Sequence, residues 1–294
     1  MRRLAASLLA GLMVIGCSTA ATPTPTAPPT AVPTASPAPT PSPEPTIDPL
    51  ITSIQDAALA TIDNETVSID FNLAFNGNST IADGEAFSGS GAAAFTEPRR
   101  LVMTADFTTL GLGEVRMIAD DTDLYLRGTF LERLHVKRGK WLLVDLTSSD
   151  PRVVPFLGIT TGQNDSSLVM YYLFGVKAPI GRLADEVVGG ETLDHFQTVV
   201  DLDLAAEQAP EAARENLLDN IAGLRSGGVE REVQTEIWIG PDGLVRQVEY
   251  TYSVGRVAGG GTITAHYAFD AYGEPIELGI PRAADVVRLE TLPR

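Results

Sequence analysis

Residues Val67–Phe75 read VSIDFNLAF, and this stretch decides the fold class. Apolar residues stand at every second position with polar or small residues between them, which is the period of a β-strand with one covered and one solvated face. Asn76-Gly77 then ends the strand with residues typical of a turn. We therefore expect a domain built on a sheet that buries one face.

The same rhythm recurs along the rest of the chain. The further strands that it predicts are Leu101–Phe107, Val115–Met117, Leu124–Leu126, Leu183–Val188, Phe196–Leu204, Val233–Ile239, Leu244–Val254 and Ile263–Phe269. Several of them follow one another through short turns, which favours antiparallel pairing. The acidic run Asp120–Asp123 is such a turn, and the alternative interpretation, oxygen ligands for calcium, lacks the later glutamate of an EF-hand.

Three segments have helical spacing. Asp48 is suited to cap a helix and Pro49 to occupy its first position, and apolar residues then recur on one face as far as Asp63. Residues 167–176 and 210–224 show the same spacing. The fold class that we predict is α+β: a single curved antiparallel sheet with helices gathered over one face.

The N-terminus predicts export and a lipid anchor. Arg2 and Arg3 precede an apolar run, Leu4–Ile15, that is too short to span a bilayer and is typical of a signal peptide over residues 1–16. Val14-Ile15-Gly16-Cys17 resembles the bacterial lipobox, so we expect Cys17 to carry a diacylglycerol thioether. The alternative is an ordinary signal peptide with an incidental cysteine. Cys17 is the only cysteine, so the chain has no internal disulfide.

Residues 17–47 follow as a tether rich in Pro, Thr and Ala, which buries too little apolar surface to fold. Residues 48–294 then form one domain. The predicted location is the extracytoplasmic face of the cell membrane, lipid-anchored. Without Arg2 and Arg3 the chain has 19 basic and 38 acidic residues, a net charge of −19. Such a charge repels phosphate backbones, so we expect no nucleic acid partner.

A family resemblance covers essentially the whole mature domain. Val187–Asp194 (VVGGETLD) leading into Phe196–Asp201 (FQTVVD) resembles a motif of the LppX/LprG-type lipid-carrier lipoproteins, which are related to the LolA/LolB-like carriers. Glu236–Arg246 (EIWIGPDGLVR) is similar to a strand-turn-strand of that family, and Tyr272–Ile276 resembles its last strand. The chain departs at His195, where the family has a glycine in a turn.

The resemblance implies a half-barrel whose concave face, covered by helices, holds an apolar cavity for the acyl chains of a lipid or glycolipid. Carriage across the envelope, without chemistry or cofactor, and an envelope transporter as a partner are further implications. The candidate lining residues are Phe71, Leu73, Phe75, Leu101, Met103, Phe107, Met117, Leu124, Leu126, Met170, Leu173, Ile237, Ile239, Val248 and Tyr250. A dry packed core would use the same alternation, and the chain would then be a non-transport surface lipoprotein with a structural or signalling role.

Catalytic patterns are missing from the sequence. It has no Gly-x-Ser-x-Gly elbow, no His-Glu-x-x-His helix and no Walker loop. The histidines His135, His195 and His266 are far apart, and Asp201 and Asp203 have the positions of a strand end and a helix cap. We therefore predict no enzyme activity, no catalytic residues and no metal site.

Overall fold

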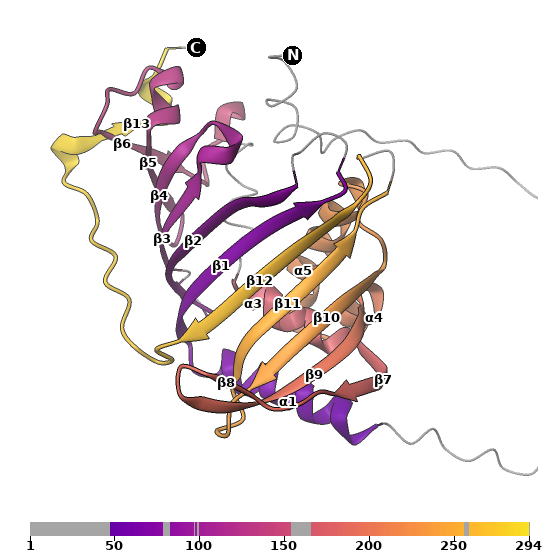
Figure 1. The fold of residues 1–294 in the computed structure, drawn as a ribbon. Coiled ribbons are helices and arrows are strands. Elements are labelled where there is room, and N and C mark those ends of the chain that lie inside the picture. Colours follow the sequence, from indigo (N-terminus) through magenta and orange to yellow (C-terminus); the bar gives the residue numbers. More distant parts are fainter. Residues whose placement is uncertain are drawn as a thin grey trace, which may run out of the picture.

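The computed structural model describes residues 48–293, apart from 79–82, 97, 99, 154–165 and 256–258. The expectations for the signal peptide, for Cys17 and for the tether lie outside the described residues. Figure 1 shows one strongly curved sheet with helices behind it, so that its convex face is toward the viewer. The predicted α+β class with a half-barrel sheet is confirmed.

The strands of the described residues are β1 (Thr66–Asn76), β2 (Gly84–Ala94), β3 (Arg100–Phe107), β4 (Gly113–Asp120), β5 (Asp123–Gly128), β6 (Trp141–Asp145), β7 (Val176–Arg182), β8 (Glu186–Val188), β9 (Glu191–Asp201), β10 (Glu232–Ile239), β11 (Val245–Ser253), β12 (Thr262–Asp270) and β13 (Val286–Arg288). The α-helices are α1 (Pro49–Ile62), α3 (Ser166–Tyr171), α4 (Leu202–Gln208) and α5 (Glu211–Ser226). Short 3-10 helices are η1 (Thr108–Leu110), η2 (Thr129–Leu134), η3 (Pro151–Val153), η4 (Tyr172–Gly175), η6 (Ala283–Asp285) and η7 (Leu289–Thr291).

The sheet runs in the order β13-β6-β5-β4-β3-β2-β1-β12-β11-β10-β9-β7, and β8 pairs with β9 beside it. Every pair is antiparallel except β13 with β6, which is parallel. The sheet is therefore antiparallel, as predicted, except at this edge. The C-terminal segment after β12 crosses to the far edge and adds β13 there, as Figure 1 shows in yellow.

Close backbone approach within the sheet occurs at β2. A Cβ on Gly91 would lie 2.1 Å from the carbonyl oxygen of Val102 on β3, and one on Gly89 would lie 2.7 Å from the ring of Phe71 on β1. Small residues at these two positions let the neighbouring strands come together and let the Phe71 ring lie over the backbone. The sequence did not predict β2, because its small residues carry no apolar alternation.

The helices lie behind the β9–β12 half of the sheet and at its lower end in the view of Figure 1. Asp48 caps α1 by accepting a hydrogen bond from the Leu50 backbone N–H at 3.0 Å. Thr61, near the end of α1, accepts one from the Val245 backbone N–H at 2.9 Å and so fastens this helix to β11. None of the described helices is long and apolar enough to cross a membrane.

Several predicted boundaries are wrong. The single helix expected over 167–176 is α3 followed by η4. The strand expected to reach Leu204 ends at Asp201, which caps α4 instead. Residues 272–282 form no strand, so the resemblance of Tyr272–Ile276 to a last strand is not realised.

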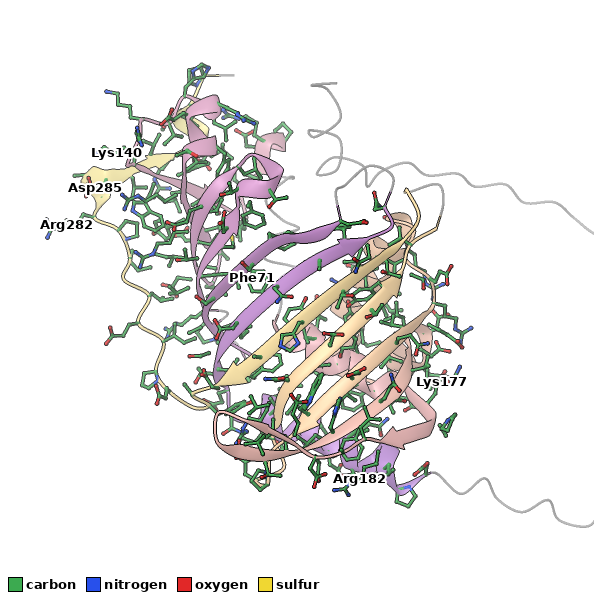
Figure 2. All side chains as sticks on the ribbon, viewed as in Figure 1. Phe71, Lys140, Lys177, Arg182, Arg282 and Asp285 are labelled. Atoms are coloured by element: carbon green, nitrogen blue, oxygen red, sulfur yellow. The ribbon has the colours of Figure 1, made fainter. Side chains whose placement is uncertain are left out.

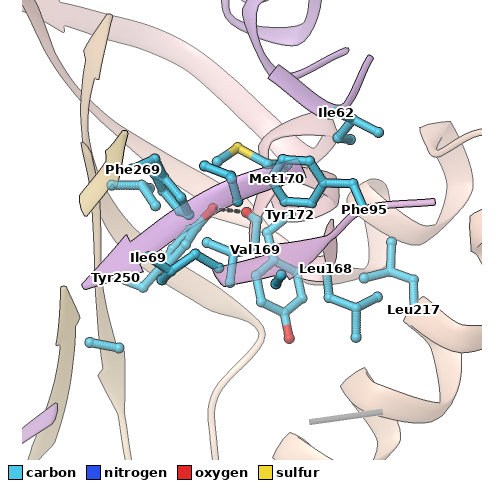
Figure 3. Close-up of a cluster of buried hydrophobic side chains, with 14 of the residues drawn as sticks. Ile62, Ile69, Phe95, Leu168, Val169, Met170, Tyr172, Leu217, Tyr250 and Phe269 are labelled. Carbon is cyan, nitrogen blue, oxygen red and sulfur yellow. Dashed lines mark hydrogen bonds between the residues drawn. The ribbon is translucent and has the colours of Figure 1, made fainter. Parts of the chain in front are cut away.

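The hydrophobic core runs from Ile54 on α1 to Leu289 on η7 and includes every layer of the described chain. Figure 3 shows its centre, where Met170 and Val169 of α3 and Leu217 of α5 face Ile69, Tyr250 and Phe269 of the sheet. The described core residues thus belong to one cluster that joins the sheet and the helices.

Candidate functional site

The strand register places the predicted lining residues on one face. Antiparallel partners point to the same side of a sheet. Phe71 is opposite Tyr267 on β12 and Gly89 on β2, and Tyr267 is opposite Val248 on β11. The same register links Met103 to Met117 and Met117 to Leu126. All thirteen predicted strand residues follow this alternation and share the concave face, over which α3 carries Met170 and η4 carries Leu173.

Twelve of the fifteen candidates are buried by the protein itself. They are Phe75, Leu101, Met103, Met117, Leu124, Leu126, Met170, Leu173, Ile237, Ile239, Val248 and Tyr250. In this structure these residues form packed core, as the alternative interpretation of the sequence predicts for them. The remaining three, Phe71, Leu73 and Phe107, are half-buried.

These three belong to a larger half-exposed surface. We call it the open patch, and it consists of Phe71, Leu73, Phe87, Phe107, Ile263 and Tyr267. The ring centroids of Phe71 and Phe87 are 6.2 Å apart, those of Phe87 and Phe107 are 5.0 Å apart, and those of Phe71 and Tyr267 are 6.5 Å apart. The open patch is thus a continuous apolar surface on β12, β1, β2 and β3.

Half of this patch was not among the predicted lining residues. Phe87 lies on the unpredicted strand β2, and Ile263 and Tyr267 lie on a predicted strand but were not chosen as lining residues. The alternation over Ile263–Phe269 puts these two on the same face as Phe269. That alternation was the available signal for Ile263 and Tyr267.

Tyrosines mark the border between the packed core and the open patch. Tyr250 donates a hydrogen bond to the Val169 carbonyl at 2.6 Å, and Tyr172 donates one to Asn220 of α5. Burial raises the pKa of Tyr267 to about 12, so its hydroxyl stays protonated at neutral pH. Within the described residues that hydroxyl makes no hydrogen bond. It is a donor beside an apolar surface, where the carbonyl of an acyl ester could accept from it.

The convex face is polar at the corresponding place. A hollow of about 470 Å³ is lined there by Asp70, Phe71, Asn72, Ser88, Gly89, Ser90, Thr104, Asp106, Glu114, His266 and Ala268. Eight of these eleven residues are polar or charged, so a ligand in this hollow would lie among hydroxyls, amides and carboxylates. The two faces of the same strands therefore differ in residue type, and the open patch lies on the concave one.

Two of the histidines lie around Trp238. His195 lies inside β9, stacked on Trp238 at 4.3 Å, and its Nε2 is 3.0 Å from Glu236 Oε2. His195, where the chain departs from the family's turn glycine, is thus part of a strand, and positive φ angles occur at Gly189 and Gly190. His266 lies on the other side of Trp238, at 6.2 Å between ring centroids. Among the described residues no three His, Cys, Asp or Glu side chains are placed to hold a metal ion.

The acidic run is a hairpin turn, as predicted. Asp120 ends β4, Asp121 has a φ of 55°, and Asp123 opens β5 opposite Asp120. Asp120 also lies 3.5 Å from Arg100 Nε. The carboxylates therefore serve the turn and an exposed ion pair.

No protein-family model and no curated protein matches the sequence. Among solved structures the chain is similar to the lipoprotein LppX of Mycobacterium tuberculosis, with 13% identity and a TM-score of 0.45 over 79% of this chain and 100% of that one. It is similar to LprF of Mycobacterium bovis, with 13% identity and a TM-score of 0.46 over 80% of this chain and 97% of that one. The MucA/MucB complex of Pseudomonas aeruginosa follows at 10% identity and a TM-score of 0.29, over 79% and 61% of the two chains.

Proposed function

We propose that this protein is a membrane-anchored extracytoplasmic lipoprotein that binds the acyl chains of a lipid or glycolipid on its concave face and carries or chaperones them across the envelope. The observation that carries the proposal is the open patch, six half-buried apolar side chains on a face that is otherwise core, four of them aromatic rings in contact. Contiguous exposed apolar surface of this kind marks a binding site more often than an incidental surface.

The energetics favour an alkyl ligand there. Burying a methylene stabilises a complex by about 0.8 kcal/mol, so even part of a fatty acyl chain laid along the open patch gives a strong gross driving force. Aromatic rings give a broad contact surface at a low cost in conformational entropy, because each has only two side-chain torsions. The Tyr267 hydroxyl at the border of the patch could then orient the ester end of the chain.

A second candidate function has its own support. Because twelve of the fifteen predicted lining residues are packed core, a non-transport lipoprotein with a structural or signalling role would need no further cavity. The two candidates differ in what they predict for bound lipid.

The test is lipid content after detergent-free purification of the segment Asp48–Arg294, measured by native mass spectrometry and by lipid extraction. Leu73→Arg puts a charge into the open patch at a half-buried position, so the fold survives and bound lipid is lost. Asn72→Arg is the matched control, because this exposed neighbour on the same strand points to the convex face.

Diacyl lipid in the wild type and in Asn72→Arg, but not in Leu73→Arg, supports the carrier. A wild-type segment that copurifies with no lipid and takes up none when lipid is added rejects the carrier and favours the structural or signalling module.

A further inference from the structure

A basic corner stands out on this acidic protein. Residues 127–140 contain Arg127, Arg133, Lys137, Arg138 and Lys140 but only one acidic residue, Glu132. The whole chain has 21 basic and 38 acidic residues, so the local balance is the reverse of the global one. We call Arg133, Lys137, Arg138, Lys140 and Arg282 the basic corner.

The fold places Arg282, which is distant in the sequence, near the other four residues of the basic corner. Lys140 Nζ donates to the Ala284 carbonyl at 2.7 Å and lies 3.1 Å from Asp285, so it holds η6 against the start of β6. Arg282 directly precedes η6. Figure 2 shows Lys140, Asp285 and Arg282 together at one corner of the molecule, far from Lys177 and Arg182 at the opposite edge.

Most of these charges are unpaired and solvent-exposed. Arg133, Lys137, Arg138 and Arg282 are exposed, and none forms an ion pair with a described residue. By contrast, Lys177 pairs with Glu232 at 2.6 Å. A basic cluster that no carboxylate of its own chain neutralises is available to an anionic partner.

Apolar side chains stand among these charges. Leu134 is 38% exposed within η2, and Ile280, two residues before Arg282, is 45% exposed. Exposed cations beside an exposed aliphatic side chain fit the interface of an anionic bilayer, where the cations meet headgroups and the aliphatic groups enter the boundary below them. A free phosphate or an acidic peptide would use the charges but not Leu134.

The basic corner adjoins the open patch. Phe107 of the patch ends β3, and its carbonyl accepts a hydrogen bond from the Leu112 backbone N–H at 3.2 Å. The Leu112 carbonyl in turn accepts from the Thr129 hydroxyl at 3.3 Å, at the start of η2. If the protein docks on a bilayer through η2, Phe107 and the neighbouring part of the open patch therefore come close to the lipids.

We propose that the basic corner is a docking surface for an anionic lipid membrane. Docking there turns the Phe107 end of the open patch toward that membrane. Each basic residue near an anionic surface contributes about 1 kcal/mol, or about fivefold in affinity. The rest of the domain is repelled by such a surface, so docking takes place through this corner alone. The proposal does not depend on whether the domain carries lipid, because it concerns attraction to the bilayer surface.

The test is flotation of the unacylated segment Asp48–Arg294 with vesicles of phosphatidylglycerol and phosphatidylcholine, and with vesicles of phosphatidylcholine alone. The expected result is binding to the anionic vesicles, weakened by salt. Lys137→Gln with Arg138→Gln lowers that affinity about 30-fold. Leu134→Ser lowers it several-fold without any change of charge.

The matched control is Lys177→Gln with Arg182→Gln, which makes the same change in net charge at the opposite edge and leaves binding unchanged. Equal losses in the two double variants, equal binding to both kinds of vesicle, or no vesicle binding at all would each overturn the proposal. Loss of binding with Lys137→Gln and Arg138→Gln but none with Leu134→Ser would also overturn it in favour of a soluble anionic ligand. Because lipid content is measured separately, a domain that carries lipid yet ignores vesicles rejects only the docking surface.

Discussion

Asp201 serves two purposes at the end of β9. Its carboxylate accepts hydrogen bonds from the backbone N–H groups of Asp203 and Leu204, at 3.0 and 3.3 Å, and so caps α4. The same buried carboxylate lies 2.7 Å from Arg231 Nη2. Burial pulls the pKa of Asp201 upward, but the hydrogen bonds from Arg231 and the backbone outweigh it and hold that pKa below its usual range.

Replacing Asp201 therefore costs stability. We expect Asp201→Asn to lower the free energy of unfolding at neutral pH by about 2 to 4 kcal/mol, because Arg231 loses its buried partner and the cap is weakened. Urea denaturation measures the change. Asp203→Asn is the control, since Asp203 is exposed and its ion pairs contribute at most about 1 kcal/mol. Equal costs at the two positions would contradict this account.

The lowered pKa of Asp201 also sets the pH dependence of stability. Burial pulls the pKa of Asp242 upward too, and hydrogen bonds led by one from Arg246 again lower it overall. A carboxyl whose pKa is depressed on folding stabilises the protein above its unfolded pKa, about 3.9, and this stability is lost as the pH falls through the folded value.

We therefore expect the free energy of unfolding to be steady above about pH 5 and to decline below about pH 4. Asp201→Asn should decline less steeply than the wild type over the acid range. Urea midpoints measured across this range test both statements. A wild type that becomes more stable on acidification would contradict the sign.

Local sequence indicated a strand end and a helix cap at Asp201 and Asp203, and in the structure Asp201 has both roles. Its partner Arg231 was not predictable, because it comes from a segment 30 residues later that the register of β9 and β10 brings alongside. The open patch shows the same limit. The alternation of β1 predicted Phe71 as a lining residue, but Phe87 on the neighbouring strand β2 was not predicted. Partners across a sheet depend on a register that no single strand encodes.

At the scale of elements, β2 shows where propensity fails. Its residues Gly84–Ala94 read GEAFSGSGAAA, which is neither β-branched nor alternating, and yet it forms a full strand between β1 and β3. The neighbouring strands supply its hydrogen bonds and require its small residues. Tertiary packing therefore overrides local preference here, and the short strand β13 was missed for the related reason that it depends on its partner β6.

Gly91 tests this explanation. We expect Gly91→Val to destabilise the domain by about 3 kcal/mol or more, because a Cβ there would collide with the rigid Val102 carbonyl. Ala92→Val, one residue later and on the convex face, should change the free energy of unfolding by less than about 1 kcal/mol. Thermal and urea denaturation give both values. A tolerated valine at Gly91 would mean that β2 and β3 are not held so close.

At the scale of the whole molecule, the alternation of the sequence predicted which side of the sheet is apolar. It could not predict which parts of that side the described helices cover, because α3, α4 and α5 come far along the chain and lie behind the β9–β12 half, while 3-10 helices contact β4 and β6. The packed region and the open patch use the same residue types. The packed region and the open patch differ in which helices cover them, and this coverage depends on the assembled fold.

The anchor is a prediction at this scale too. We expect Cys17→Ser to release the protein from the salt-washed membrane fraction of cells, because stable attachment needs acyl chains, whereas charge contacts of the basic corner with an anionic surface are weakened by salt. Mass spectrometry of the mature N-terminal peptide should find a diacylglyceryl group on Cys17 in the wild type. An unmodified Cys17, or a Cys17→Ser protein that stays in the salt-washed membrane fraction, would contradict the lipobox interpretation.

The measurement that tests the central claim most directly is photo-crosslinking of the segment Asp48–Arg294 with a phospholipid that carries a photoactivatable group on its acyl chain. Peptide mapping then locates the adducts. The account predicts adducts on Phe71, Leu73, Phe87, Phe107 and Tyr267, and their loss when unlabelled lipid competes. Adducts confined to the convex face, around Asn72 and Thr104, or no adducts that competition removes, would contradict acyl-chain binding on the concave face.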